Sequence, residues 1–161
     1  MEKIEHFNRC VYCFEKKTSP GPCPVCGYDD GPCDSPEWCL LPGSMLKGHY
    51  VVGRYISSTA AEITYLGWDL WMNHDVEIVE YFPKDWVNRN IADSETVSSI
   101  PGCEAQIEAG RQAFFEKVKL FYQCVSRIGE VDMDFFVRNN TCYYVRRKNK
   151  KKGTSEADAR K

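Results

Sequence analysis

The sequence lacks any long apolar segment. A membrane-spanning helix needs about 18 or more consecutive apolar residues, and no window of this chain approaches that length. The first ten residues, MEKIEHFNRC, also lack the apolar run of a secretory signal peptide. We therefore expect a soluble, cytoplasmic protein that has no membrane partner.

Recognisable catalytic constellations are also missing. The three histidines are scattered outside any metal or nucleophile motif, so we expect surface or structural roles for them. No Cys-His arrangement accompanies Cys103, Cys124 or Cys142. We expect Cys124 and Cys142 to be small core residues.

The chain lacks an even distribution of positive and negative charge, although its formal net charge is only −2. Six of the 21 Lys and Arg residues lie within positions 146–152, which leaves 15 basic against 23 acidic residues, or −8, for the rest. Clustered basic residues attract nucleic-acid phosphates, although a terminal charge run is more often a solvated tail. Nucleic-acid binding through the basic tail and the cysteine-rich amino-terminal segment, described next, is therefore the alternative function.

Cysteine is abundant, with nine residues in 161. Cys10-Val-Tyr-Cys13 and Cys23-Pro-Val-Cys26 form two knuckles separated by nine residues, which is the spacing of a tetrahedral four-thiolate zinc site. Gly27 permits the tight turn that follows the second pair. Residues 1–30 are therefore predicted to form a zinc ribbon in which the metal is structural, because four thiolates fill its coordination sphere.

Residues 31–43 are predicted to be a linker because proline and glycine interrupt regular structure there. Cys33 and Cys39 could extend a metal site, but their spacing favours free thiols. We expect Trp38, Leu40 and Leu41 to attach the linker to the domain that follows.

Residues 44–148 have the pattern of an α+β domain with a five-stranded antiparallel sheet and one main helix. Strands rich in Val, Ile, Tyr and Trp are expected over 50–56, 62–69, 75–82, 134–138 and 141–145, and the segment 84–102 is expected to be a loop. An apolar stripe predicts a helix over 103–128, capped by Gly129. We expect Phe114, Phe115, Phe121 and Tyr122 to pack as core against the sheet. Residues 149–161 are expected to be a basic, polar, disordered tail.

Several motifs in this domain resemble the amino-terminal lobe of bacterial serine/threonine protein kinases that carry an amino-terminal zinc ribbon. They are Leu41-Pro42-Gly43, Tyr50-Val-Val-Gly53, Ile63-Thr-Tyr-Leu66, Trp68-Asp69 and Glu80-Tyr-Phe-Pro83. The resemblance runs from Leu41 to about Lys148. It implies a glycine-rich-loop hairpin, a third strand and a helix that flank a nucleotide site.

The chain departs from the family at the residues that bind nucleotide. Kinase loop glycines let the backbone approach the phosphates, and the aligned positions here are Ser57, Thr59 and Glu62. The lysine that pairs with the phosphates aligns with Val79. Its glutamate partner on the helix aligns with Lys117, or with Glu116 after a shift of one residue. We therefore expect no ATP binding and no catalytic residue in the chain.

The resemblance therefore implies a degenerate, pseudokinase-like lobe. The sequence also contains no His-Arg-Asp catalytic loop and no Asp-Phe-Gly motif, so the carboxy-terminal lobe is expected to be absent. Such a chain is expected to be a non-catalytic protein-interaction or regulatory module. Surface normally covered by that lobe would favour a protein partner or self-association.

Overall fold

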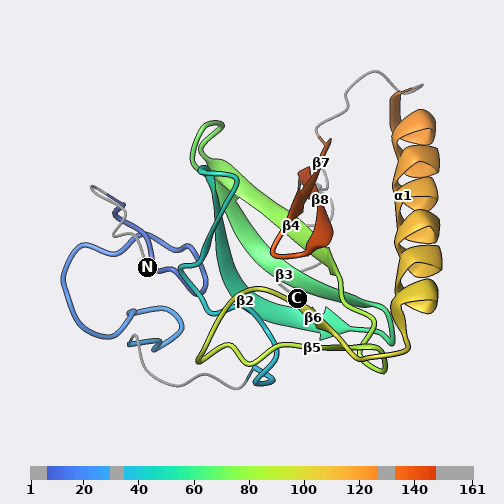
Figure 1. The fold of residues 1–161 in the computed structure, drawn as a ribbon. Coiled ribbons are helices and arrows are strands. Elements are labelled where there is room, and N and C mark those ends of the chain that lie inside the picture. The colour runs from blue at the N-terminus through green and yellow to red at the C-terminus, as the bar shows by residue number, and fades with distance from the viewer. Residues whose placement is uncertain (1–6, 30–34, 127–132, 148–161) are drawn as a thin grey trace, which may run out of the picture.

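The protein is seen in a computed structural model that describes residues 7–29, 35–126 and 133–147. A six-stranded antiparallel sheet dominates it, with the order β1-β2-β3-β4-β8-β7 (Figure 1). Its strands are β1 (Met45–Leu46), β2 (Tyr50–Ser58), β3 (Glu62–Asp69), β4 (His74–Tyr81), β7 (Met133–Arg138) and β8 (Thr141–Arg147). Within the described residues one α-helix, α1 (Glu104–Ser126), accompanies the sheet. The predicted α+β class is confirmed at this level.

The prediction of five strands was wrong by one. All five expected segments form strands, and β1 adds a sixth by pairing Met45 with Val51 and Leu46 with Tyr50. A two-residue strand is too short to produce the alternation from which strands are recognised. The tight connection from β1 to β2 is closed by Lys47 and Gly48, whose φ angles are 53° and 78°.

Asn139 and Asn140 form the turn between β7 and β8, as the sequence predicted. Their φ angles are 54° and 60°, in the left-handed region that a two-residue hairpin turn requires. The ladder then runs from Arg138 opposite Thr141 to Met133 opposite Arg146.

The sheet curls until it is nearly closed, because its two ends meet through side chains. On β7, Asp134 accepts hydrogen bonds from Lys47 Nζ at 2.8 Å and from Tyr50 Oη at 2.9 Å. The ring of Phe136 stacks on Tyr50 with a centroid separation of 5.9 Å. Side chains therefore join the two ends of the sheet.

Helix α1 packs on the sheet through its first four turns. Ile107, Phe114 and Val118 recur on one face of the helix and are buried. On β4, Tyr81 donates a hydrogen bond from Oη to the Ile107 carbonyl at 2.9 Å. A β-carbon on Gly110 would lie 2.1 Å from that hydroxyl oxygen, so glycine permits the close approach.

The expected core role of the later aromatic residues was wrong. Phe115, Phe121 and Tyr122 are 40%, 40% and 50% exposed, although Phe115 contacts the Phe135 ring of β7 and the Phe121 ring lies 6.0 Å from the Arg146 guanidinium of β8. Cys124 is likewise exposed, whereas Cys142 is buried as predicted. Helical periodicity gives the direction of a stripe but not the point at which its partner ends. The expected helix end at residue 128 and the Gly129 cap lie outside the described residues.

The segment 84–102 is more ordered than the loop that was predicted. It contains a separate strand pair, β5 (Val87–Asn88) with β6 (Ser98–Ser99), and it delivers Arg89 into the core. Both side-chain nitrogens of the Arg89 fork lie 2.7 Å from the carboxylate oxygens of Glu80, and both side chains are fully buried. Tyr65 donates to the same carboxylate at 2.8 Å. Such a fork satisfies a buried carboxylate with two parallel hydrogen bonds.

Arg89 also holds the segment that precedes the sheet. Its Nε donates to the Trp38 carbonyl at 2.8 Å, and the Trp38 ring stacks on Phe82 at 5.6 Å. Leu40 is buried, which agrees with the predicted attachment, whereas Leu41 is 41% exposed. None of the described helices is long and apolar enough to cross a membrane.

Candidate metal centre and the positions of the nucleotide site

The two cysteine knuckles have matching backbone geometry. In the first, the Phe14 amide donates to the Cys10 carbonyl at 2.9 Å, and in the second the Gly27 amide donates to the Cys23 carbonyl at 2.9 Å. Phe14 and Gly27 both have positive φ, at 63° and 80°. The tight turn expected at Gly27 is therefore present, and Phe14 makes the equivalent turn without being glycine.

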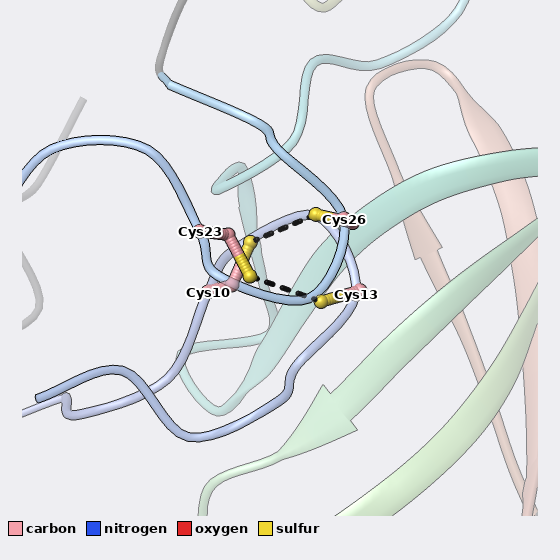
Figure 2. Close-up of side chains that lie close together, drawn as sticks. All are labelled: Cys10, Cys13, Cys23 and Cys26. Carbon is pink, nitrogen blue, oxygen red and sulfur yellow. Dashed lines mark hydrogen bonds between the residues drawn. The ribbon is translucent and has the colours of Figure 1, made fainter.

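The sulfur atoms of Cys10, Cys13, Cys23 and Cys26 converge on one point (Figure 2). All four lie within 4.8 Å of one another, and the pairs Cys10–Cys26 and Cys13–Cys23 are each 3.7 Å apart. A tetrahedral ion with metal–sulfur bonds of about 2.3 Å places its ligands about 3.8 Å apart. The four cysteines therefore could hold one metal ion.

Backbone amides also point at these sulfurs. Tyr12 N donates to Cys10 Sγ and Val25 N donates to Cys23 Sγ, each at 3.4 Å. Backbone hydrogen bonding, first from Cys26 and then from Val25, lowers the pKa of Cys23 to about 6, against the opposing effect of burial. Such hydrogen bonds stabilise the thiolate form, which is the form that binds metal.

The thiols of Cys13 and Cys26 resist ionisation without a cation. Burial is the largest cause that raises the pKa of Cys13 far above its usual range, and burial also raises the pKa of Cys26. Four thiolates so close together would repel one another, so a divalent cation is the group that makes full deprotonation favourable.

The first knuckle docks on the sheet through Phe14. This side chain is 3% exposed, and its ring lies 5.9 Å from that of Trp68 on β3. A β-carbon on Gly53 of β2 would lie 2.5 Å from Phe14 Cε2, so the ring fits only over glycine. Arg9 adds a cation–π contact 4.2 Å from the Trp68 ring centre, and Arg54 N donates to the Tyr12 carbonyl at 3.1 Å. The loop that carries Cys10 and Cys13 is therefore anchored to strands β2 and β3.

The five positions that the kinase resemblance assigned to nucleotide binding lie at the opposite end of this face. Because side chains alternate along β3, Glu62 and Trp68 lie on the same face of the sheet. Val79 on β4 pairs with Thr64 and is buried. Ser57 and Thr59 are exposed in the hairpin between β2 and β3.

An ion pair joins two of these positions. Lys117 on α1 contacts the Glu62 carboxylate through Nζ, and it also lies 5.4 Å from the Phe114 ring and 5.9 Å from the Tyr144 ring. Glu116, the alternative from the shifted alignment, instead accepts a hydrogen bond from Gln112 on the exposed side of the helix. Of the two candidates, Lys117 is therefore the one that faces the sheet.

Thr59 forms hydrogen bonds with backbone amides of its own hairpin. Its Oγ1 accepts hydrogen bonds from Ala61 N at 3.2 Å and Glu62 N at 3.1 Å, and its own amide donates to the Glu62 carbonyl at 2.8 Å. A phosphate-binding loop needs such amides to point at the ligand. In this chain the amides of Ala61 and Glu62 instead form hydrogen bonds within the turn.

Of the two cysteines in the predicted linker, Cys39 lies within the described residues. It is buried apart from the four-cysteine cluster, and burial raises the pKa of its thiol to about 12. A free buried thiol, as the sequence favoured, fits this environment. Cys33 lies outside the described residues.

Sequence reasoning missed three contacts: the Phe14–Gly53 packing, the Glu62–Lys117 ion pair and the buried Glu80–Arg89 pair. Only the first left a local signal. Gly53 interrupts an apolar strand, and an isolated strand glycine often marks close approach of another group.

Comparisons with known proteins give one informative match. No protein-family model and no curated protein matches the chain. A solved structure described as "PpkA-294 apo form", from a bacterial serine/threonine kinase, resembles it with a TM-score of 0.59 and 19% sequence identity. The similarity covers 68% of this chain but only 38% of the solved chain, so this chain corresponds to a minor part of that structure. At this identity the likeness concerns the fold alone.

Proposed function

We propose that this chain is a non-catalytic protein-interaction or regulatory module, built on a degenerate kinase amino-terminal-lobe fold with a structural zinc ribbon. The fold likeness to the kinase fragment supports the framework. The observation on which the proposal depends is the Glu62–Lys117 ion pair beside the buried Val79.

The charged residues at the proposed nucleotide positions disfavour binding of a triphosphate. In an active kinase, a strand lysine paired with a helix glutamate contacts the phosphates. Here the strand position is apolar Val79, the helix position is Lys117, and the counter-charge is a carboxylate at the loop position Glu62. A nucleotide phosphate would have to displace that carboxylate or be repelled by it.

The loop backbone adds to this argument. Because Thr59 accepts the amides of Ala61 and Glu62, those donors are engaged within the hairpin. Exposing them to a phosphate would require two internal hydrogen bonds to break. The engaged hairpin amides and the replacement of the strand lysine by Val79 are thus separate obstacles to nucleotide binding.

Zinc is the metal that best suits the four-cysteine cluster. Tetrahedral thiolate sets select zinc or iron–sulfur centres, and the sulfur separations of 3.7 Å match one zinc ion with four bonds of about 2.3 Å. Elemental analysis of purified protein is expected to give one zinc per chain. Stoichiometric iron with visible absorbance would contradict this assignment.

Melting of the full chain with MgATP tests the proposal. A nucleotide at about 100 times its dissociation constant stabilises a protein by about 2.7 kcal/mol, which corresponds to a shift of roughly 10 °C for a domain of this size. We expect no shift for the natural chain. We also expect none for Glu62→Gln, which removes the repelling charge and frees the Lys117 ammonium but leaves the hairpin amides engaged by Thr59. A saturable rise in the melting temperature of the natural chain would overturn the proposal.

The nucleic-acid alternative makes a different prediction. It requires free basic groups, yet Arg146 at the end of β8 pairs with Glu77 at 2.7 Å. Nucleic-acid binding through the basic residues would give a mobility shift at low salt that disappears steeply as salt is added. We expect no such shift.

A further inference from the structure

The outer edge of β7 has no backbone ladder in the described parts of the chain, and it meets the other end of the sheet through the side chains of Asp134 and Phe136. On one side β7 pairs with β8, and nowhere in the described parts of the chain does a strand pair with its other side. Val137 on this strand is 64% exposed. An open edge with exposed apolar residues is a template for strand addition. We propose that β7 pairs antiparallel with β7 of a second copy of this chain, so that two sheets join across a twofold axis.

The β7–β8 turn determines which backbone groups point outward. Asn139 and Asn140 make a two-residue turn, so Arg138 and Thr141 are the closing pair of the hairpin. In such hairpins the closing pair exchanges both backbone hydrogen bonds, and bonded and non-bonded pairs alternate from there. The backbone groups of every second residue of β7 therefore face away from β8.

Phe135 and Val137 are two of these outward-facing residues. Pairing centred on Phe136 places Phe135 opposite Val137 of the second copy, where both pairs can form backbone hydrogen bonds. The same register places Asp134 opposite Arg138 of the second copy. These are non-bonded positions, in which facing side chains lie closest together.

The charges of β7 are self-complementary in this register. A twofold axis forms each contact twice, so one Asp134–Arg138 match gives two cross-strand ion pairs. The internal contacts of Asp134 with Lys47 and Tyr50 both use Oδ2. Because a carboxylate accepts at both oxygens, Arg138 of the second copy can bind at Oδ1.

Helix α1 supplies apolar side chains beside the same edge. Phe115 contacts Phe135 of β7 at 5.2 Å, so this side of the helix faces the edge strand. Tyr122 lies seven residues later, two turns along the same side. The two side chains are 40% and 50% exposed. They would be covered by the second copy.

The helix spacing in the joined sheet suits large side chains. Phe114 lies over Tyr144 of β8 at 5.5 Å, and two β8 strands separated by two β7 strands are roughly 14 Å apart. Directly packed helices are about 8–10 Å apart, so aromatic residues are needed to fill the space between them. Phe115 and Tyr122 of each copy are placed to do so.

This inference rests on the proposed function and names its partner and surface. The two proposals can fail independently, because a chain that does not dimerise through β7 can still show no response to MgATP. A nucleotide-binding chain that dimerises through β7 would overturn the proposed function alone.

Sedimentation equilibrium of the full chain from about 1 to 100 µM tests the pairing. The natural chain is expected to dimerise, and Arg138→Asp and Asp134→Arg each to weaken dimerisation at least about 100-fold, because like charges then face each other twice. Mixing the two variants restores both ion pairs and is expected to restore a heterodimer. Lys16→Asp, an equal charge change at an exposed ribbon residue, is expected to dimerise normally.

Amide hydrogen exchange gives an independent result if Asp134→Arg folds poorly. Phe135 and Val137 amides are expected to become protected as natural chain concentration rises, whereas the Phe136 amide is protected throughout by β8. A monomer whose Phe135 and Val137 amides exchange freely at all concentrations overturns the inference. Protection that arises only when a heterologous extended peptide is added also overturns it, in favour of a different strand.

Discussion

Packing of Phe14 over Gly53 gives the sharpest stability prediction. Phe14 is 3% exposed, so Phe14→Ala removes a buried aromatic side chain and is expected to cost about 3–5 kcal/mol of unfolding free energy. In Gly53→Ala, the new β-carbon would lie 2.5 Å from Phe14 Cε2 and 3.0 Å from the Leu66 carbonyl oxygen. Overpacking of this kind is expected to cost about 1–3 kcal/mol.

The double variant isolates the contact between them. Once the Phe14 ring is gone, the added β-carbon meets only the milder contact with Leu66. The combined cost should therefore fall below the sum of the single costs by at least about 0.5 kcal/mol. Val25→Ala, at a 65% exposed ribbon residue, is the control and should change stability by no more than about 0.5 kcal/mol.

Urea unfolding followed by circular dichroism measures these four free energies at saturating metal. Metal content of each variant should be measured in parallel, so that loss of docking is distinguished from loss of the metal. Strictly additive costs, or a Phe14→Ala cost below about 1 kcal/mol, would refute docking of the ribbon through this ring.

Three further predictions concern the core, the ion pair and the metal. Arg89→Met leaves the buried Glu80 carboxylate without its partner and should lower the unfolding free energy by about 3–5 kcal/mol. The double variant Glu80→Gln with Arg89→Met should cost less than the sum of the two single changes. Urea unfolding measures both effects. Lys117→Met breaks a partly exposed pair with Glu62 and should change the free energy by no more than about 1 kcal/mol, so a larger loss in thermal melts would contradict a surface role. If a metal links the two cysteine knuckles as proposed, chelation should make residues 7–29 sensitive to protease while the far-ultraviolet spectrum of the sheet and α1 persists; loss of the whole spectrum would contradict this.

Local patterns predicted the parts of the fold that local chemistry determines. The cysteine spacing identified all four converging residues, and alternating apolar residues identified five strands of the six-stranded sheet. Asparagine residues identified the β7–β8 turn because they tolerate positive φ. Each of these signals lies within a few residues of the structure it specifies.

Contacts between distant segments could not be predicted in this way. Arg89 lies in a polar segment that resembles a solvated loop, and the pairing of β3, β4 and β8 brings Tyr65, Glu80 and Tyr143 together where its side chain enters the core. Phe121 belongs to the same periodic stripe as the buried Phe114, yet its ring is 40% exposed and meets the sheet near the end of β8, at Arg146. Burial therefore depended on the extent of a partner that the helix sequence does not encode.

Amide spectra of the isotopically labelled chain with and without MgATP test the central claim most directly. The account predicts no saturable change at Ser57, Thr59, Glu62, Val79 or Lys117, because the proposed alignment with a kinase lobe places a carboxylate and an apolar side chain at the positions of the phosphate ligands. Saturable shifts confined to those five residues would contradict it and identify a working nucleotide site.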